Sequence, residues 1–145
     1  MKTHPSERWA TALGLAGALP FAVLSVSVWS PPWQAQAVPA LLTYSALILS
    51  FLGGVRWGRA LSGDRPQEYL WAVLPSLWAW GALQLPSLAG LLLLAVGFVA
   101  LWWLDGPADR LSAPAWFRRL RSVLTALVLA SHVIAVLALS AALPA

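Results

Sequence analysis

The chain has 145 residues, of which 60% are hydrophobic and 10% are charged, with nine Lys and Arg, five Asp and Glu and no cysteine. This composition excludes a soluble domain, because there is too little polar material to cover one, so most of the surface must face lipid. The lack of cysteine excludes disulfides, Cys-ligated zinc, iron–sulfur clusters and thiol catalysis, and the small basic excess is typical of membrane orientation rather than of nucleic-acid binding.

A helix needs about 20 apolar residues to cross a bilayer, and five stretches of this chain are near that length. In chain order they are 9–29, 38–59, 69–85, 87–104 and 117–143, and the third and fourth form a hairpin that turns at Pro86. The proline-containing segments Ser30–Ala37 and Asp105–Pro107 are expected to be loops that end helices. The sequence therefore predicts one all-α domain over 1–145, an integral membrane bundle of five transmembrane helices.

The charged residues fall into three short clusters, within 2–8, 56–68 and 105–121. If the chain crosses the membrane five times, these clusters all lie on one side, and they contain all nine Lys and Arg. Basic residues are retained on the cytoplasmic side of membranes. We therefore expect the N-terminus inside and the C-terminus outside.

Small residues recur at helical spacing on the first two predicted helices. Such residues let membrane helices approach closely, which makes them candidates for helix packing. An alternative is that a ligand or a lipid headgroup approaches the backbone there. The positions are Ala10, Gly14 and Ala18 on the first helix, and Ala46, Ser50, Gly53, Gly54 and Gly58 on the second, and the two ridges are candidates to face each other.

Arg56 lies about one turn inside the cytoplasmic end of the second helix, where an unpaired charge costs about 3 kcal/mol or more. We expect it to extend to the interface or to pair with Asp105, Asp64 or Glu68. A functional alternative is a site for an anionic ligand or lipid headgroup, and a structural one is an orientation anchor closed by a salt bridge. The candidate headgroup site comprises Arg56, Arg59, Asp105, Arg118, Arg119 and Arg121.

His132 is the ionisable residue that lies clearly within the predicted hydrocarbon region, at a depth similar to that of Tyr44. The two side chains are a candidate intramembrane polar pair. A proton relay or cofactor ligand is the functional interpretation, and a histidine bonded between helices is the structural one. A single histidine with no second histidine or carboxylate at that depth is a poor metal or haem site, so we expect no metal and no cofactor.

Catalytic motifs are not found in the sequence. The chain has no metal-binding H-E-x-x-H motif and no glycine-rich phosphate loop. Asp105 and Asp109 are four residues apart, but we expect Gly106 and Pro107 to break the helix between them. We therefore assign no catalytic residue and do not expect an enzyme.

Four segments resemble a known family: Leu13–Phe21, Tyr44–Gly58, Val73–Trp80 and Trp116–Thr125. Together they extend over nearly the whole chain, and Tyr44–Gly58, which reads YSALILSFLGGVRWG, is the most specific. They are similar to the family called domain of unknown function 3429, which includes proteins described as transmembrane protein 69-like. The resemblance implies a small multi-pass protein of the bacterial inner membrane, or of the mitochondrial inner membrane in a eukaryote, and it implies no activity.

Three functions are compatible with these features. The first is a non-enzymatic assembly factor, accessory subunit or oligomerising protein, whose partners are membrane lipids and a second copy or a larger membrane complex. The second is a small transporter or channel lined by Tyr44, His132, Gln84 and Arg56. The third is a lipid-headgroup binding protein or enzyme at the cytoplasmic face, built on Arg56, Asp105 and the arginines near Arg121.

Overall fold

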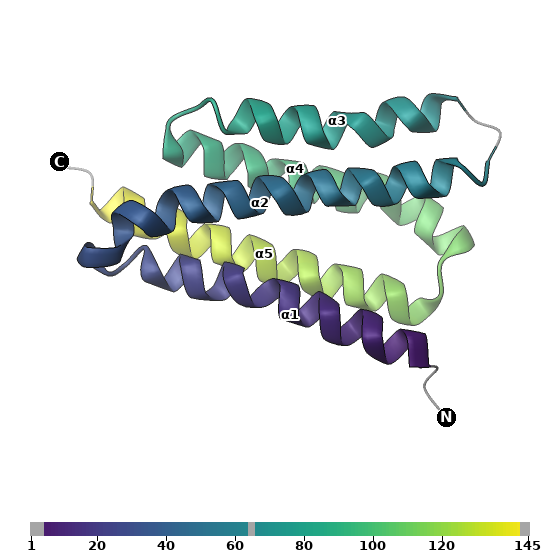
Figure 1. Cartoon of the computed structure of the whole chain (residues 1–145), viewed down its shortest axis with the longest axis horizontal. Coiled ribbons are helices and arrows are strands. Elements are labelled where there is room, and N and C mark those ends of the chain that lie inside the picture. The colour runs from purple at the N-terminus through teal and green to yellow at the C-terminus, as the bar shows by residue number, and fades with distance from the viewer. Residues whose placement is uncertain (1–4, 64–65, 143–145) are drawn as a thin grey trace.

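The computed structural model describes residues 5–63 and 66–142, without the side chains at 5 and at 107–112. This part of the chain forms five helices whose axes are roughly aligned, and the chain reverses direction from each helix to the next (Figure 1). They are α1 (Pro5–Ser27), α2 (Pro31–Ala60), α3 (Gln67–Ala82), α4 (Ser87–Ser112) and α5 (Ala115–Ala141). The predicted all-α fold is confirmed, and α3 and α4 form the hairpin expected at Pro86.

Four of these helices are long and apolar enough to cross a membrane. The qualifying segments are Ser6–Ser27, Pro31–Ala60, Ser87–Gly106 and Ala115–Ala141. Helix α3 has 16 residues, which is fewer than the roughly 20 that a crossing needs. The fifth crossing and the orientation therefore stay predictions.

Two of the predicted loops are wrong. Their prolines were expected to end helices, but in the structure these prolines lie within α2 and α4. Residues 31–37 belong to the start of α2, where Pro31 and Pro32 occupy the first helical positions and no backbone donor is needed. Helix α4 continues through Gly106 and Pro107 to Ser112. Proline there removes one backbone hydrogen bond, and the chain turns instead between Ser112 and Ala115.

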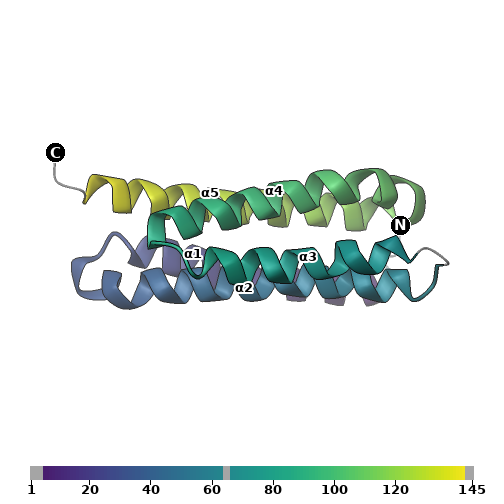
Figure 2. The ribbon, with the colours of Figure 1, turned by 90° about the horizontal axis from the view of Figure 1, so that it is seen from above.

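The helices form two layers. Helices α1, α2 and α3 make one layer, with α2 in the middle, and α4 and α5 make the other (Figures 1 and 2). Phe21, Leu41, Leu49 and Leu94 are among the fully buried side chains between the layers. Many large apolar side chains on the outer surface are exposed, as expected for a surface that faces lipid.

Helix α3 packs closely against both of its neighbours. A Cβ atom at Gly53 of α2 would lie 2.5 Å from the carbonyl oxygen of Ala72, so the two backbones meet without an intervening side chain. The hydroxyls of Ser50 and Ser76 are hydrogen-bonded at 2.8 Å, and the indole N–H of Trp78 donates to the Leu93 carbonyl of α4 at 2.7 Å. These contacts hold α3 to α2 and α4.

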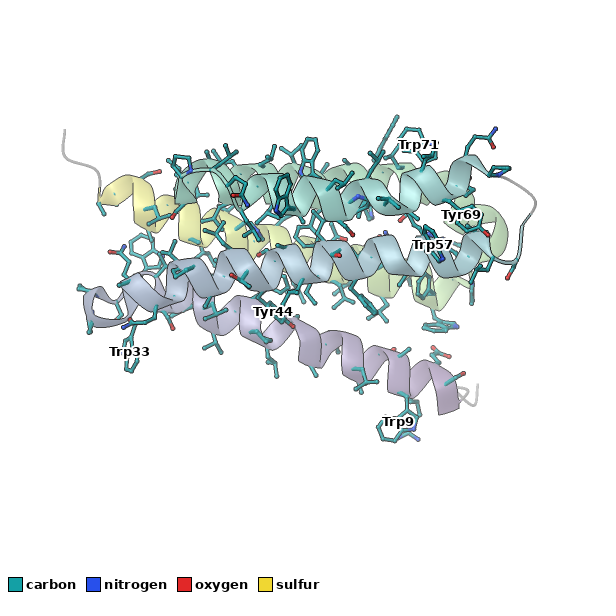
Figure 3. The ribbon with its side chains drawn as sticks, turned by 45° about the horizontal axis from the view of Figure 1, so that its top comes forward. Trp9, Trp33, Tyr44, Trp57, Tyr69 and Trp71 are labelled. Atoms are coloured by element: carbon teal, nitrogen blue, oxygen red, sulfur yellow. The ribbon has the colours of Figure 1, made fainter. Side chains whose placement is uncertain are left out.

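Helix α1 packs more loosely against α2. The two helices are close near the α1–α2 turn and diverge toward the N-terminal end of α1 (Figure 1). The hydroxyl of Tyr44, which lies where α2 meets α1 (Figure 3), donates to the Gly17 carbonyl at 2.9 Å. The indole N–H of Trp29, just after α1, donates to the Ile134 carbonyl of α5 at 3.1 Å. Helix α1 is therefore connected by polar contacts at its middle and at its C-terminal end.

Candidate functional site

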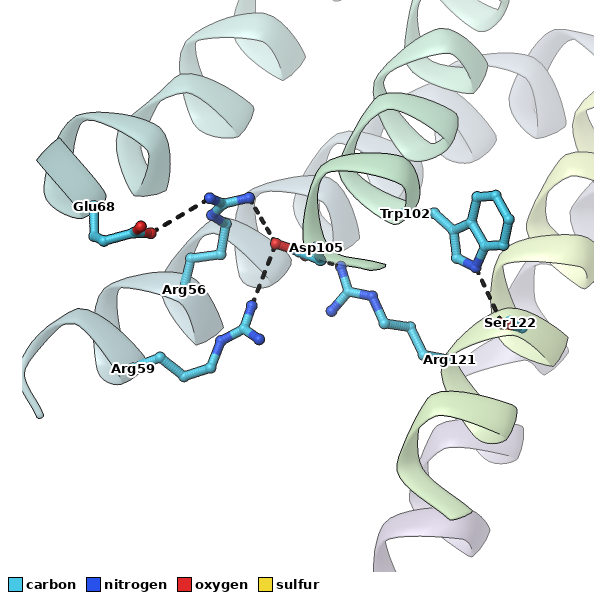
Figure 4. Close-up of polar contacts among 7 residues, drawn as sticks. All are labelled: Arg56, Arg59, Glu68, Trp102, Asp105, Arg121 and Ser122. Carbon is cyan, nitrogen blue, oxygen red and sulfur yellow. Dashed lines mark hydrogen bonds and ion pairs between the residues drawn. The ribbon is translucent and has the colours of Figure 1, made fainter. Parts of the chain in front are cut away.

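Asp105 is the centre of an ion-pair cluster that connects four helices (Figure 4). Its carboxylate lies 2.6 Å from Nη1 of Arg56 and 3.3 Å from Nη2 of Arg59, both on α2. Arg121 of α5 pairs with its second oxygen, and Arg56 lies 3.6 Å from a carboxylate oxygen of Glu68 on α3. We call Arg56, Arg59, Glu68, Asp105 and Arg121 the Asp105 cluster.

The centre of the cluster is shielded from solvent, whereas Arg59 and Glu68 at its rim are 37% and 43% exposed. The Asp105 side chain is 2% exposed, and those of Arg56 and Arg121 are 11% and 10% exposed. A carboxylate removed from water is destabilising unless cations and hydrogen bonds replace its hydration shell, and here arginines contact both oxygens. Within the described residues, Nε of Arg56 is buried without a hydrogen-bond partner.

The structure brings together part of the predicted headgroup site. Arg56 pairs with two of its three predicted partners, Asp105 and Glu68, while Asp64 lies outside the described residues. Arg118 donates from Nη1 to the Ala113 carbonyl at 2.8 Å. Arg119 is exposed. Glu68 belongs to the cluster, although the predicted headgroup site did not include it.

A groove of about 420 Å³ lies between α1, α2 and α5. Its volume falls within the roughly 300–1,000 Å³ of small-molecule sites. Apolar side chains form nearly all of the wall, and Phe98 of α4 contributes to it. Arg121 is the one charged residue in the lining, so the groove adjoins the Asp105 cluster. Sequence reasoning missed this groove because it results from the divergence of α1 from α2.

The small residues of α1 line this groove rather than packing on the small residues of α2. Ala10, Gly14 and Ala18 are all in the lining. A Cβ atom at Gly14 would lie 3.0 Å from Cδ1 of Leu124, so Gly14 faces α5. The recurrence of glycine and alanine on α1 is the signal in the sequence that marks this wall, although it does not reveal a groove.

The small residues of α2 are divided between two faces. Ala46 and Gly53 are buried, and Ser50 bonds to α3, whereas Gly54 and Gly58 are exposed with no atom within 4 Å of an added Cβ. The physical reason is helical geometry. Four residues make one full turn plus about 40°, so side chains at this spacing move around the helix, and Gly54 and Gly58 point away from the bundle.

Tyr44 and His132 have separate hydrogen-bond partners and do not form the predicted pair. Tyr44 donates to Gly17, and Nδ1 of His132 bonds to the Val128 carbonyl at 2.8 Å. Both rings contact Phe21, with centroid distances of 4.9 Å for Tyr44 and 6.1 Å for His132. Tyr44 bonds to a carbonyl of α1 and His132 to one of its own helix, so the two side chains are linked through the ring of Phe21 and not by a hydrogen bond.

The family described as protein of unknown function, DUF3429, matches residues 6–137. Transmembrane protein 69 of Xenopus tropicalis is 36% identical over 132 residues, which cover 83% of this chain and 51% of that protein. The chain thus spans about half the length of this curated relative. No solved structure matches the chain.

Proposed function

The chain belongs to the DUF3429 family of membrane proteins, and we propose that it is a non-enzymatic protein that binds a lipid with an acidic headgroup. An acyl chain of the lipid occupies the groove between α1, α2 and α5. The headgroup lies at the end of the groove that carries Arg121. The observation that supports this proposal is a membrane-embedded apolar groove that adjoins a basic cluster.

Charge supports an acidic headgroup. The formal net charge of the sequence is +4, and every charged residue lies near the N-terminus, between positions 56 and 68, or between 105 and 121. Two arginines at this end of the bundle are accessible to a headgroup. Arg119 is exposed, and the side chain of Arg59, at the rim of the Asp105 cluster, is 37% exposed. Each basic residue near a membrane surface attracts acidic lipid by about 1 kcal/mol.

The proposal includes an orientation. Helix α3 lies beside α2 and α4 and acts as a fifth, short crossing. Five crossings place the basic end of the bundle in the cytoplasm, because basic residues are retained there. The membrane is then the bacterial inner membrane or its mitochondrial counterpart.

Lipid binding ranks ahead of transport for a structural reason. A transport path needs polar side chains that follow one another through the bundle. Tyr44 bonds to α1, and Gln84, just after α3, bonds to the Trp80 carbonyl of α3 at 3.3 Å. These side chains therefore serve local contacts at separate places.

Lipid retention tests the proposal. The purified protein is stripped of lipid, incubated with an equal mixture of phosphatidylglycerol and phosphatidylcholine, and examined by native mass spectrometry. We expect retained phosphatidylglycerol in the wild type. Ala18→Phe should abolish retention, because Ala18 lines the groove and a phenyl ring there fills it.

Two controls make the test specific. Ala16→Phe adds the same ring to the exposed face of α1, outside the groove lining, and should leave retention unchanged. Equal retention of the two lipids by the wild type contradicts the headgroup assignment. Retention by Ala18→Phe at the wild-type level contradicts the groove assignment.

An assembly role is the second candidate, and the exposed pair Gly54 and Gly58 favours it. No atom lies within 4 Å of an added Cβ at either position, so a helix of another copy or another protein has room to approach. If this face is an interface, Gly54→Leu should lower the oligomeric mass in mild detergent. Gly81→Leu is the matched control, since Gly81 also has no atom within 4 Å. Equal effects of the two changes contradict the role.

A further inference from the structure

His132 carries a buried polar atom without a hydrogen-bond partner. The residue is 1% exposed, and its Nε2 atom has no partner in the described structure. Buried polar atoms are almost always hydrogen-bonded, and within a membrane there is no bulk water to replace a missing partner. The Nε2 atom is therefore a candidate position for a further hydrogen bond.

The other nitrogen of the ring determines which kind of group this is. A carbonyl oxygen only accepts hydrogen bonds, so Nδ1, which lies 2.8 Å from the Val128 carbonyl, must carry the hydrogen and donate it. In the neutral ring this leaves Nε2 with a lone pair and no hydrogen. The missing partner of Nε2 is a hydrogen-bond donor.

The imidazole lies directly behind the wall of the groove. Phe21 and Phe98 both line the groove, and their ring centroids are 6.1 Å and 5.8 Å from that of His132. Val128, whose carbonyl bonds Nδ1, lines the groove as well. The imidazole of His132 thus packs against two aromatic side chains whose residues line a space that suits an apolar molecule.

We propose that the end of the groove at Phe21 and Phe98 binds an apolar molecule with a hydroxyl group, a phenol or an alcohol, which donates a hydrogen bond to Nε2 of His132. Access requires rotation of one phenylalanine ring, a motion of ordinary side-chain timescale. The apolar part of the molecule occupies the groove. The proposal shares this groove with the proposed function but does not depend on the acidic headgroup or on the arginines.

A pair of probes tests the donor directly. Para-nonylphenol and its methyl ether differ in one hydroxyl hydrogen and have the same apolar tail. We expect the phenol to bind the wild-type protein about fivefold more tightly than the ether, the ratio of a typical net hydrogen bond. Nitrogen NMR of the histidine side chains provides the second measurement, because the sequence has two histidines and His4 serves as an internal reference. The phenol should move the Nε2 resonance of His132, while the ether should not.

Variants separate the donor contact from general packing. His132→Phe keeps a ring but removes the acceptor, so the two probes should bind equally. Ser131→Ala is the matched control, because Ser131 bonds to the Leu127 carbonyl of its own helix, and the advantage of the phenol should persist. The wild-type comparison decides the proposal even if His132→Phe does not fold.

Several results would overturn the inference. Equal affinities of phenol and ether for the wild type would do so, as would an advantage of the phenol that survives in His132→Phe. The Nε2 chemical shift could also show a hydrogen-bonded nitrogen before the phenol is added and stay unchanged after its addition. In that case water is the partner of Nε2, and the inference is overturned. Retention of phosphatidylglycerol by His132→Phe should equal that of the wild type, so failure here is distinguishable from failure of the proposed function.

Discussion

Helices α3 and α1 both pack on α2, but by different means. Helix α3 meets α2 backbone to backbone at Gly53, and a hydrogen bond joins Ser50 to Ser76. Helix α1 is joined to α2 through the Tyr44 hydroxyl and leaves a groove beside it. Membrane helices associate through packing and hydrogen bonds rather than by the hydrophobic effect. Helix α3 is thus closely packed on α2, and the α1 side has the space to bind a ligand.

The largest effect is expected at the Asp105 cluster, which connects α2, α3, α4 and α5. Asp105→Asn keeps the side-chain shape but removes the buried negative charge that Arg56 and Arg121 contact. The free energy of unfolding should fall by about 3–5 kcal/mol, measured by denaturant titration in detergent. Glu68→Gln is the control, because this partner is 43% exposed and should contribute at most about 1 kcal/mol. Equal losses for the two variants would contradict the central role of Asp105.

The contact between α2 and α3 should be next in size. Gly53→Ala places a methyl group 2.5 Å from the Ala72 carbonyl oxygen, and the two backbones must separate to accept it. We expect a loss of about 1–3 kcal/mol in the same unfolding titration. Gly54→Ala, one residue away and open to the surface, should stay within about 0.5 kcal/mol of the wild type. If Gly53→Ala is as stable as Gly54→Ala, α3 is not held by close backbone contact.

The smallest effect on stability is expected at α1. Tyr44→Phe removes the hydroxyl that bonds to the Gly17 carbonyl and should lower the free energy of unfolding by about 0.5–1.5 kcal/mol. Hydrogen exchange should show faster exchange in α1 and little change in α3. Ser45→Ala removes a hydroxyl that bonds within α2, to Leu41, and should leave exchange in α1 unchanged. Uniform acceleration over all helices would argue against α1 as a separately mobile element.

Composition and hydropathy predicted the helical fold because lipid allows few alternatives to long apolar helices. The errors at Pro31–Ala37 and Gly106–Pro107 have one cause, which is that proline is compatible with a helix start and can be tolerated inside a long helix. The ion pairs of Arg56 were predictable, since a buried arginine must find an acid. The groove was not predictable from the sequence. It depends on the angle between α1 and α2, and no single residue determines that angle.

Photo-crosslinking of a bound lipid shows whether its acyl chain occupies the groove between α1, α2 and α5. Phosphatidylglycerol that carries a diazirine in its acyl chain is bound to the purified protein, excess lipid is removed by dilution, and the crosslinked residues are mapped by mass spectrometry. We expect crosslinks at residues of α1 and α5 that line the groove, such as Leu13, Ala18 and Leu124. Crosslinks spread evenly over exposed apolar residues, including Leu70 and Leu77 of α3, would contradict it.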